Sequence, residues 1–435
     1  MTSAVTALTP PPRQPIAGET AAIVAPRSDD TSYAHTLRRR GMRSVAVLLP
    51  PQPRSTRHHG HHGANPAGPY TTHVTHTAGL RRTVKQLRTL DVRAILAGSD
   101  HGIELAEQIA RKLGLPGCPP ETAHLRYDRG AQAQALRAAG LDAPRGLRTA
   151  SLREALQWWD VSGLPRCELL PAATGTPLDP VVCRSRSDVT TAWTHMRHAA
   201  DRFADDPHLV VREHLAGRQY VVNTVTHPGI DAPPHHLITD VWAQTNTPKN
   251  WPARLDLLRQ NATGLLSRAL SLYTTRALKT LHVACGPVCL RLVHAEGRGP
   301  LLLSAQAVAH SSPADYALRA STGADRMGDA LDSVLLARPS RPTPAPNGHH
   351  VVRIFLHAPR GGTLHPALLR TLAALPAVVG ADDQLTPLSK VPVTTGPSTV
   401  AGEIVLSSDS RDDIEAAYRV VRALETTGLY EGGRR

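Results

Sequence analysis

The stretch LVVREHLAGRQYVVNTVT, residues 209–226, contains two β-strand patterns separated by a short turn. Residues 209–212 and 219–226 are rich in valine and threonine, and a glycine lies between them. Short apolar or alternating segments bounded by turn residues are typical of antiparallel sheet. The same character recurs further along the chain, at residues 236–243, 288–294 and 301–307. We therefore predict an antiparallel sheet in the middle of the chain.

The sequence before this sheet has the pattern of a small doubly wound α/β domain. Two apolar segments, residues 45–49 and 92–97, are predicted to be buried parallel strands. Helices are predicted over residues 79–90 and 103–113. A turn containing glycine, residues 98–102, joins the second strand to its helix, as in a βαβα unit.

The rest of the chain divides at proline-rich segments. Residues 1–42 are rich in Pro, Thr and Arg without a period, which predicts a mobile arm. After the central sheet, a strand, a helix, a strand and a long helix predict a small α+β unit. The predicted organisation is a disordered arm, an N-terminal α/β domain, a central domain, a Pro-rich linker and a C-terminal α+β domain, over residues 1–42, 43–122, 123–336, 337–349 and 350–435.

The composition excludes several classes of protein. The chain has 435 residues, 41% of them hydrophobic and 20% charged, so it is neither disordered nor fibrous. No apolar segment approaches the roughly 20 residues of a membrane-spanning helix, and no secretory signal is recognised at the N-terminus. The five cysteines are scattered, and only Cys285 and Cys289 are close in sequence, with poor spacing for zinc. We expect a cytoplasmic protein without a membrane partner.

The positive charge is distributed along the chain. There are 49 Lys and Arg against 36 Asp and Glu, a formal charge of +13, and arginine supplies most of it. Nucleic-acid-binding proteins concentrate basic residues and interleave aromatic ones, which make up only 3% here, so we do not expect a nucleic-acid partner. The segment RHHGHHG, residues 57–63, is interpreted as a low-complexity loop that binds a transition metal adventitiously. The lysines are few, namely Lys85, Lys112, Lys249, Lys279 and Lys390.

Several motifs resemble, in order and spacing, those of the ATP-grasp superfamily, in particular its carboxylate–amine or L-amino acid ligase branch. Residues 210–222, VVREHLAGRQYVV, resemble the hinge that binds adenine. Residues 126–129, RYDR, resemble the start of the helix that carries a phosphate-binding lysine. GPVCLR at 286–291 and GPLLLSAQ at 299–306 resemble the paired strands that carry the metal ligands. A strand at 402–406 before an acidic helix resembles the C-terminal domain of the amino acid ligases.

The resemblance covers about residues 43–430 and implies a fold and a reaction. The implied fold class is α+β and ATP-grasp-like, with a small N-terminal doubly wound α/β domain, a two-lobed clamp and a C-terminal α+β domain. The implied cofactors are ATP and Mg²⁺, because a hard cation and oxygen ligands neutralise phosphate charge during phosphoryl transfer. The implied reaction is ADP-forming amide bond formation between a small-molecule carboxylate and an amine, through an acyl phosphate. A homo-oligomer or a complex with an active ligase subunit is also compatible with the resemblance.

The resemblance assigns roles to individual positions. The catalytic positions are Arg129 and Arg291. The positions of the metal ligands are Ser304 and Gln306. The ATP-binding positions are Arg129, Leu170, Arg212, Glu213, Leu215 and Gln219.

This sequence departs from the family at positions that would contact the nucleotide and the metal. Arg129 and Leu170 stand where the family has lysines; arginine can bind phosphate with two donors, but leucine cannot. Arg291 and Ser304 stand where the family has carboxylates, and Arg291 would repel Mg²⁺. Gln219 replaces a glutamate, which is a mild change because an amide also forms hydrogen bonds. Two interpretations stay open: an active ligase with divergent chemistry, and a catalytically inactive relative that binds a small molecule or a partner subunit.

Overall fold

A computed structural model describes most of the chain. The described residues are 18–27, 32–50, 69–77, 79–176, 178–203, 206–229, 232–246, 252–258, 264–309, 319, 323, 325–335, 350–382, 384–396 and 399–432. The histidine-rich segment, the predicted linker and the first 17 residues lie outside this set. None of the helices within it is long and apolar enough to cross a membrane.

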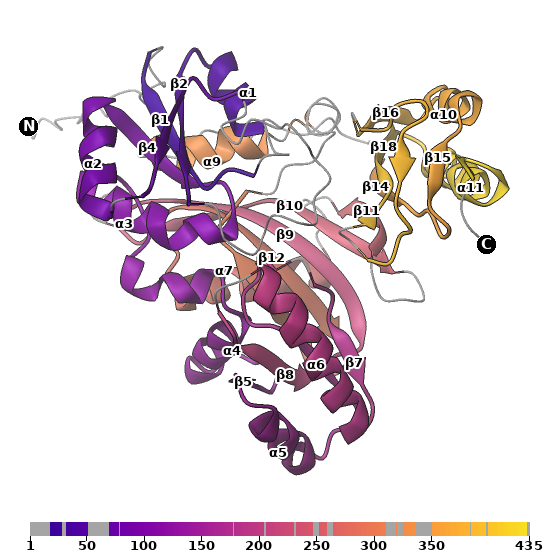
Figure 1. The fold of residues 1–435 in the computed structure, drawn as a ribbon, viewed down its shortest axis with the longest axis horizontal. Helices are drawn as coiled ribbons and strands as arrows, with labels where there is room; N and C mark the ends of the chain where they lie inside the picture. Colours follow the sequence, from indigo (N-terminus) through magenta and orange to yellow (C-terminus); the bar gives the residue numbers. More distant parts are fainter. Residues whose placement is uncertain are drawn as a thin grey trace, which may run out of the picture.

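The N-terminal domain is built on a parallel sheet with the strand order β3-β2-β1-β4. The strands are β1 (Thr20–Val24), β2 (Arg43–Leu48), β3 (Thr72–Thr75) and β4 (Val92–Ala97). The helices are α1 (Ser32–Arg39), α2 (Leu80–Thr89) and α3 (Ile103–Leu113), with short 3-10 helices at Asp100–Gly102 and Pro120–Arg126. This domain lies at the upper left of Figure 1.

The prediction of a disordered arm over residues 1–42 is wrong for the part that the structure describes. Residues 20–24 form the strand β1, which is buried along its whole length and pairs with both β2 and β4. The helix α1 follows and buries Tyr33 and Leu37. The apolar run TAAIV is short and stands among Pro-rich and polar residues, so its partners, which are distant in sequence, decide its structure.

The small lobe of the clamp is a four-stranded antiparallel sheet with two helices on one face. Its strand order is β5-β8-β6-β7, with β5 (Gly146–Thr149), β6 (Cys167–Pro171), β7 (Val181–Cys183) and β8 (Leu209–Glu213). The helices are α5 (Leu152–Ser162) and α6 (Arg186–Phe203). The N-terminus of α5 is capped by Ser151, whose side chain accepts a hydrogen bond from the backbone of Glu154.

The large lobe is an eight-stranded sheet that continues into the C-terminal domain. The strand order is β13-β12-β9-β10-β11-β14-β18-β16. The strands of the large lobe are β9 (Gly217–His227), β10 (His235–Asn246), β11 (Pro252–Leu258), β12 (Gly286–Ala295) and β13 (Gly299–Gln306). Three helices pack against these strands: α4 (Arg129–Ala138), α7 (Leu265–Thr280) and α9 (Arg326–Leu335). Figure 1 shows this sheet between the N-terminal domain above and the small lobe below.

The C-terminal domain shares the large sheet through the pairing of β11 with β14. Its strands in that sheet are β14 (His350–Leu356), β16 (Val378–Ala381) and β18 (Gly402–Ser408). A second, three-stranded sheet contains β15 (Gly362–Leu364), β17 (Lys390–Val391) and β19 (Tyr430–Glu431). The helices are α10 (Pro366–Ala373) and α11 (Arg411–Thr427). The α+β architecture with a doubly wound domain, a two-lobed clamp and a C-terminal domain is therefore confirmed.

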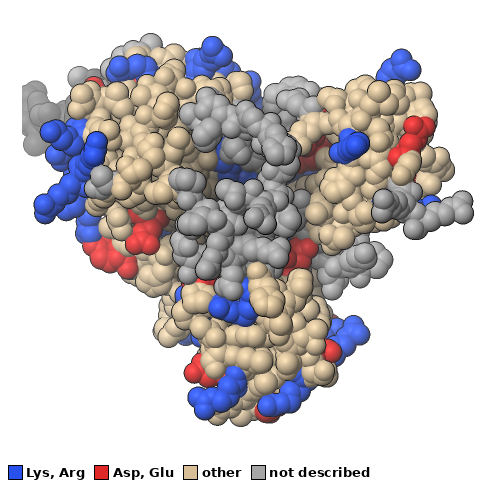
Figure 2. All heavy atoms as spheres, in the orientation of Figure 1, with Lys and Arg blue, Asp and Glu red and all other residues tan. Residues whose placement is uncertain are grey.

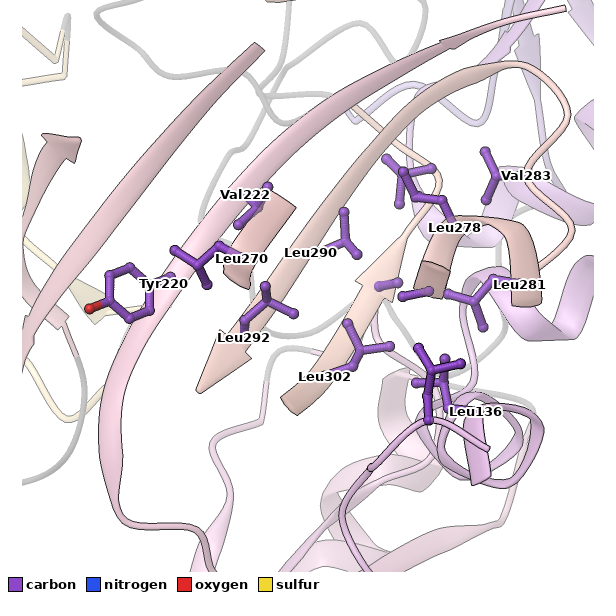
Figure 3. Close-up of a cluster of buried hydrophobic side chains, with 14 of the residues drawn as sticks. Leu136, Tyr220, Val222, Leu270, Leu278, Leu281, Val283, Leu290, Leu292 and Leu302 are labelled. Atoms are coloured by element: carbon purple, nitrogen blue, oxygen red, sulfur yellow. The ribbon is translucent and has the colours of Figure 1, made fainter. Parts of the chain in front are cut away.

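One face of the large sheet packs against α4 and α7. Figure 3 shows this core, in which Val222, Leu290 and Leu302 of the sheet meet Leu136 and Leu278 of the helices. Burial of each such side chain contributes about 1.5–3 kcal/mol. The opposite face is turned toward the small lobe and carries Arg291, Ser304 and Gln306, to which the resemblance assigned catalytic and metal-binding roles.

Candidate functional site

Arg129 is the first residue of α4, and it holds the loop that follows β6. Its guanidinium donates hydrogen bonds to the carbonyl oxygens of Pro171, Ala173 and Thr174, at 2.8, 2.6 and 3.3 Å. Burial, and then the charge of the neighbouring Arg212, lower the pKa of Arg129 to about 9, so it is still charged at neutral pH. The arginine at the first lysine position therefore positions this loop and brings positive charge into the space between the lobes.

Leu170 leaves the second lysine position apolar. Along β6, Cys167 and Leu169 pack in the core beneath α5 and α6. Leu170 belongs to a separate small cluster with Ala172 and Val210, and it is only 1% exposed. Because side chains alternate along a strand, Leu170 lies on the face of the small sheet that is opposite the helices. The apolar side chain of Leu170 cannot bind a phosphate, so this position supplies no positive charge.

Arg212 is the last residue but one of β8, and it links the two lobes. Its Nε atom lies 3.1 Å from Glu168 Oε2, and its Nη1 atom donates to the carbonyl oxygen of Leu303 in β13 at 2.8 Å. His214 also contacts Glu168, at 2.8 Å. Burial raises the pKa of Glu168, but Arg212 and His214 outweigh it and lower the pKa below its ordinary value. Glu168 is therefore ionised and fixes Arg212 across the opening between the lobes.

The remaining hinge positions are occupied by structural contacts. The Glu213 carboxylate accepts hydrogen bonds from the Arg145 backbone and from Arg298 Nη1, at 2.8 and 2.9 Å. Leu215 packs against an apolar cluster around Val293. The Gln219 side-chain oxygen accepts a hydrogen bond from Gln244 at 2.9 Å. These side chains stabilise the hinge, and a nucleotide base would have to use its backbone groups.

Arg291 stands in the middle of β12 with its side chain exposed, although Leu290 and Leu292 on either side are buried. It lies directly opposite Ser304 in the pairing of β12 with β13. No described residue forms a hydrogen bond or an ion pair with it. Burial raises the pKa of Asp179, and the charge of Arg291 opposes this shift, so the two side chains lie within electrostatic reach. Arg291 is thus a cation without a bound carboxylate between the lobes.

Gln306 is tied to the N-terminal domain. Its Nε2 atom donates to Asp100 Oδ2 at 2.7 Å, and the Thr174 hydroxyl donates to the same oxygen at 2.7 Å. Asp100 follows the strand β4, so it joins the N-terminal domain, the loop after β6 and the large lobe at one point. The sequence showed the turn at residues 98–102, but nothing in it indicated these contacts, which depend on the packing of three separate segments.

The residues present do not fit Mg²⁺. A magnesium site needs oxygen ligands, usually including carboxylates. Within the described part of the chain, no group of three or more His, Cys, Asp or Glu side chains could hold a metal ion. Arg291 would repel a cation, Ser304 is neutral, and the Gln306 side chain is held by the hydrogen bond that its Nε2 atom donates to Asp100. The expectation of a magnesium cofactor therefore finds no support in the geometry of these positions.

A basic pocket lies between the start of α4, the small sheet and β13. Its empty space, which is open to solvent, is about 350 Å³. It is lined by arginines and by apolar side chains, namely Arg129, Arg137, Arg148, Arg212, Leu147, Val210, Leu302 and Leu303 among others. Two of the predicted ATP-binding residues, Arg129 and Arg212, therefore share one pocket. Leu170, Glu213, Leu215 and Gln219 do not line it.

Comparison with solved structures identifies the fold. L-amino acid ligase from Bacillus licheniformis has a TM-score of 0.71 at 15% identity, over 94% of this chain and 98% of that chain. N5-carboxyaminoimidazole ribonucleotide synthetase in an ADP complex has a TM-score of 0.67 at 13% identity, over 95% and 98% of the two chains. The biotin carboxylase domain of 2-oxoglutarate carboxylase from Hydrogenobacter thermophilus, solved with MgADP and bicarbonate, has a TM-score of 0.63 at 13% identity, over 96% and 91%.

These solved structures are ATP-grasp ligases, so this chain has the ATP-grasp fold, as the motifs predicted. The match with the amino acid ligase extends over nearly the whole of both chains, including the C-terminal domain. No protein-family model and no curated protein matches the sequence.

Proposed function

We propose that this chain is a catalytically inactive relative of the ATP-grasp ligases that binds an anionic small molecule between its lobes without Mg²⁺. The observation that carries the proposal is Arg291, an exposed cation without a bound carboxylate at a position where the ligase motif has a metal-binding carboxylate. An inactive relative needs no metal, and an arginine there favours an anion.

The electrostatics of the cleft support the same proposal. Burial lowers the pKa of Arg129, and the charges of Arg212 and Arg291 lower it further, so both guanidinium groups repel that of Arg129. An anion between them would relieve this repulsion and would be stabilised in a partly desolvated site. Guanidinium groups bind phosphate and carboxylate oxygens with two parallel hydrogen bonds. A nucleotide is the first candidate, because residues 210–222 resemble the hinge that binds adenine.

An active carboxylate–amine ligase is the second candidate. It is favoured by the match with the L-amino acid ligase over 94% of this chain, which includes both lobes and the C-terminal domain. Without Mg²⁺ and the family's lysines, a ligase would need other groups to neutralise the charge of the transferred phosphate. Arg129 and Arg291 are the side chains that we propose for this role. The two candidates differ in one measurable respect, because only the ligase consumes ATP.

Calorimetric titration with ATP and ADP, with and without Mg²⁺, tests the proposal. We expect binding in the absence of Mg²⁺, weakened about tenfold or more in Arg291→Gln because a charged hydrogen bond is lost. Arg218→Gln is the matched control, because Arg218 is also an exposed arginine, on the neighbouring strand β9, and the strand register places it on the face of the sheet opposite Arg291. Phosphate release on addition of amino acids and amines would overturn the inactive assignment in favour of the ligase.

We also propose a cytoplasmic location, which the five unbridged cysteines support. The resemblance to ATP-grasp ligases also leads us to propose a homo-oligomer or a complex with an active ligase subunit. Sedimentation of the purified chain, alone and with a co-expressed ligase, would test these assemblies.

A further inference from the structure

Two of the five cysteines lie next to each other on paired strands of the small lobe. Cys167 in β6 and Cys183 in β7 are directly opposite in the antiparallel pairing of these strands. Both have 0% exposure and belong to the same core cluster, so their side chains lie on the same face of the sheet. Directly opposite residues have Cα atoms about 4.5–5.5 Å apart, which is within the range that a disulfide spans.

The two thiols interact in the reduced protein. A hydrogen bond from the Cys167 thiol lowers the pKa of Cys183, and the same contact together with burial raises the pKa of Cys167. Cys183 is therefore the better nucleophile of the pair, since the thiolate is the reactive form. The geometry and the polarity of the pair are both those needed for disulfide exchange.

The strand β7 gives a reagent access to this buried pair. It is three residues long and lies at the edge of its sheet, hydrogen-bonded to β6 alone among the described strands. Val181 and Val182 are half-buried. A short edge strand opens more readily than the centre of a sheet, because it has few contacts to break. Cys118 and Cys285 form a second pair of neighbouring cysteines. The Cys118 Sγ atom lies 3.2 Å from the carbonyl oxygen of Cys285, but neither residue belongs to a short edge strand.

The segment between the two cysteines is the loop that Arg129 and Asp100 hold. Residues 172–176 follow β6, and their carbonyl oxygens at Ala173 and Thr174 accept hydrogen bonds from Arg129. The Thr174 hydroxyl contacts Asp100. A covalent bond between β6 and β7 would fix the base of this loop, which borders the space between the lobes.

We propose that Cys167 and Cys183 are a reversible disulfide site that fastens the base of the loop at residues 172–176 when a small-molecule disulfide is available. The Cys183 thiolate attacks one sulfur of the oxidant, forms a mixed disulfide and releases one thiolate. The Cys167 thiolate then attacks Cys183 Sγ and releases the second. Two protein thiols are oxidised, the oxidant is reduced to two thiols, and the protons pass to the released thiolates. This inference goes beyond the proposed function and does not depend on it.

Mapping of disulfides in the full chain tests the site. The reduced protein is incubated with oxidised and reduced glutathione at a series of ratios, and free thiols are then alkylated in denaturant and identified by mass spectrometry. We expect a peptide linked through Cys167 and Cys183, reversed by dithiothreitol, while Cys289 stays alkylated. The measurement is repeated in Cys118→Ser, which removes the second pair of neighbouring cysteines, Cys118 and Cys285. If that variant does not fold, the linked peptide is identified in the wild-type chain instead.

Hydrogen exchange then tests the effect on the loop. We expect amide exchange in residues 172–176 to slow several-fold on oxidation and to be unchanged in Cys183→Ser under the same conditions. Alkylation of both Cys167 and Cys183 at every glutathione ratio would overturn the site. A linked peptide without any change in exchange at 172–176 would overturn the fastening of the loop.

Discussion

The two faces of the large sheet are built from alternate residues of the same strands, yet they differ in the charge and exposure of the residues around the middle of β12. On the face toward α4 and α7, Val222, Leu290 and Leu292 are completely buried in an apolar core (Figure 3). On the face toward the small lobe, Arg291 is exposed and Gln219 is bound only to another amide. The first face is an apolar core, whereas the second combines buried apolar residues such as Trp242 and Val293 with the polar positions of the candidate site. The apolar core on the first face can therefore support the ATP-grasp fold whichever residues stand at Arg291 and Ser304.

The same contrast holds for arginines. Arg126 is completely buried, and its guanidinium binds both oxygens of Glu107, at 2.6 and 2.7 Å, and the carbonyl oxygen of Leu281 after α7. Arg291 is exposed and has no such partner among the described residues. Positive charge is in fact spread over the visible surface of all parts of the molecule, as Figure 2 shows. An arginine in this chain is thus informative only through what surrounds it.

Loss of the buried arginine gives the largest expected effect. Arg126→Met leaves Glu107 buried without a partner, and we expect the free energy of unfolding to fall by about 3–5 kcal/mol. Urea denaturation measures the loss. The double variant Arg126→Met with Glu107→Gln removes the unpaired charge and should recover part of it. An unchanged midpoint in Arg126→Met would show that this buried pair is not needed for stability.

The apolar face gives the next largest effect. Leu290→Ala removes a side chain with 0% exposure from the core beneath the large sheet, and we expect a loss of about 2–5 kcal/mol. Thermal unfolding of this variant beside wild type checks the value. Leu272→Ala is the matched control, because Leu272 on α7 is 64% exposed and should change stability by less than about 0.5 kcal/mol. Equal losses in the two variants would contradict the division between the faces.

A pH-dependent effect of intermediate size is expected at α9. Burial, and then Asp325 and Asp332, raise the pKa of Asp329 from 3.8 to about 7. Folding therefore favours the protonated form, and its stabilising effect, present below about pH 4, is lost as the pH rises through 7. Asp329→Asn stays neutral, so we expect it to gain on the order of 1–2 kcal/mol over wild type between about pH 5 and 8. Urea midpoints that keep a constant difference over this range would refute the shift.

The smallest effect on stability is expected at the centre of the cleft face. Arg291→Ala removes an exposed side chain that contacts no described partner, so the free energy of unfolding should change by less than about 0.5 kcal/mol. The change also relieves the repulsion between Arg291 and Arg129. Differential scanning calorimetry checks it. A loss of more than about 2 kcal/mol would mean that Arg291 has a structural role like that of Arg126.

The order of motifs predicted the fold because the apolar alternation of β9, β12 and β13 survives in the sequence. Leu290 and Leu292 mark the buried face whatever stands between them. The strand β1 was missed, since its role depends on β2 and β4, which lie 20 or more residues away. The continuation of the large sheet into the C-terminal domain was missed for the same reason, because β11 pairs with β14 across a long separation in sequence.

The roles assigned to the site residues stay predictions, and their contacts were not indicated by the sequence. The motifs placed Arg129, Arg212 and Arg291 at the nucleotide and metal positions, and the structure brings them within electrostatic reach of one another. The bond from Arg212 to the Leu303 carbonyl and the junction at Asp100 join segments far apart in the chain. Such contacts depend on how the lobes pack against each other in three dimensions, which the spacing of motifs along the sequence does not predict.

The most direct test compares the Mg²⁺ dependence of ATP affinity in wild type and in a variant with the ligase motif restored. The variant combines Arg291→Glu, Ser304→Glu and Gln306→Asn, and calorimetry measures both proteins with and without Mg²⁺. We predict that Mg²⁺ leaves wild-type affinity unchanged or weakens it, because Mg²⁺ neutralises the charge that the arginines bind. We predict that the restored variant binds ATP only with Mg²⁺. Wild-type binding that requires Mg²⁺ would contradict a metal-free anion site.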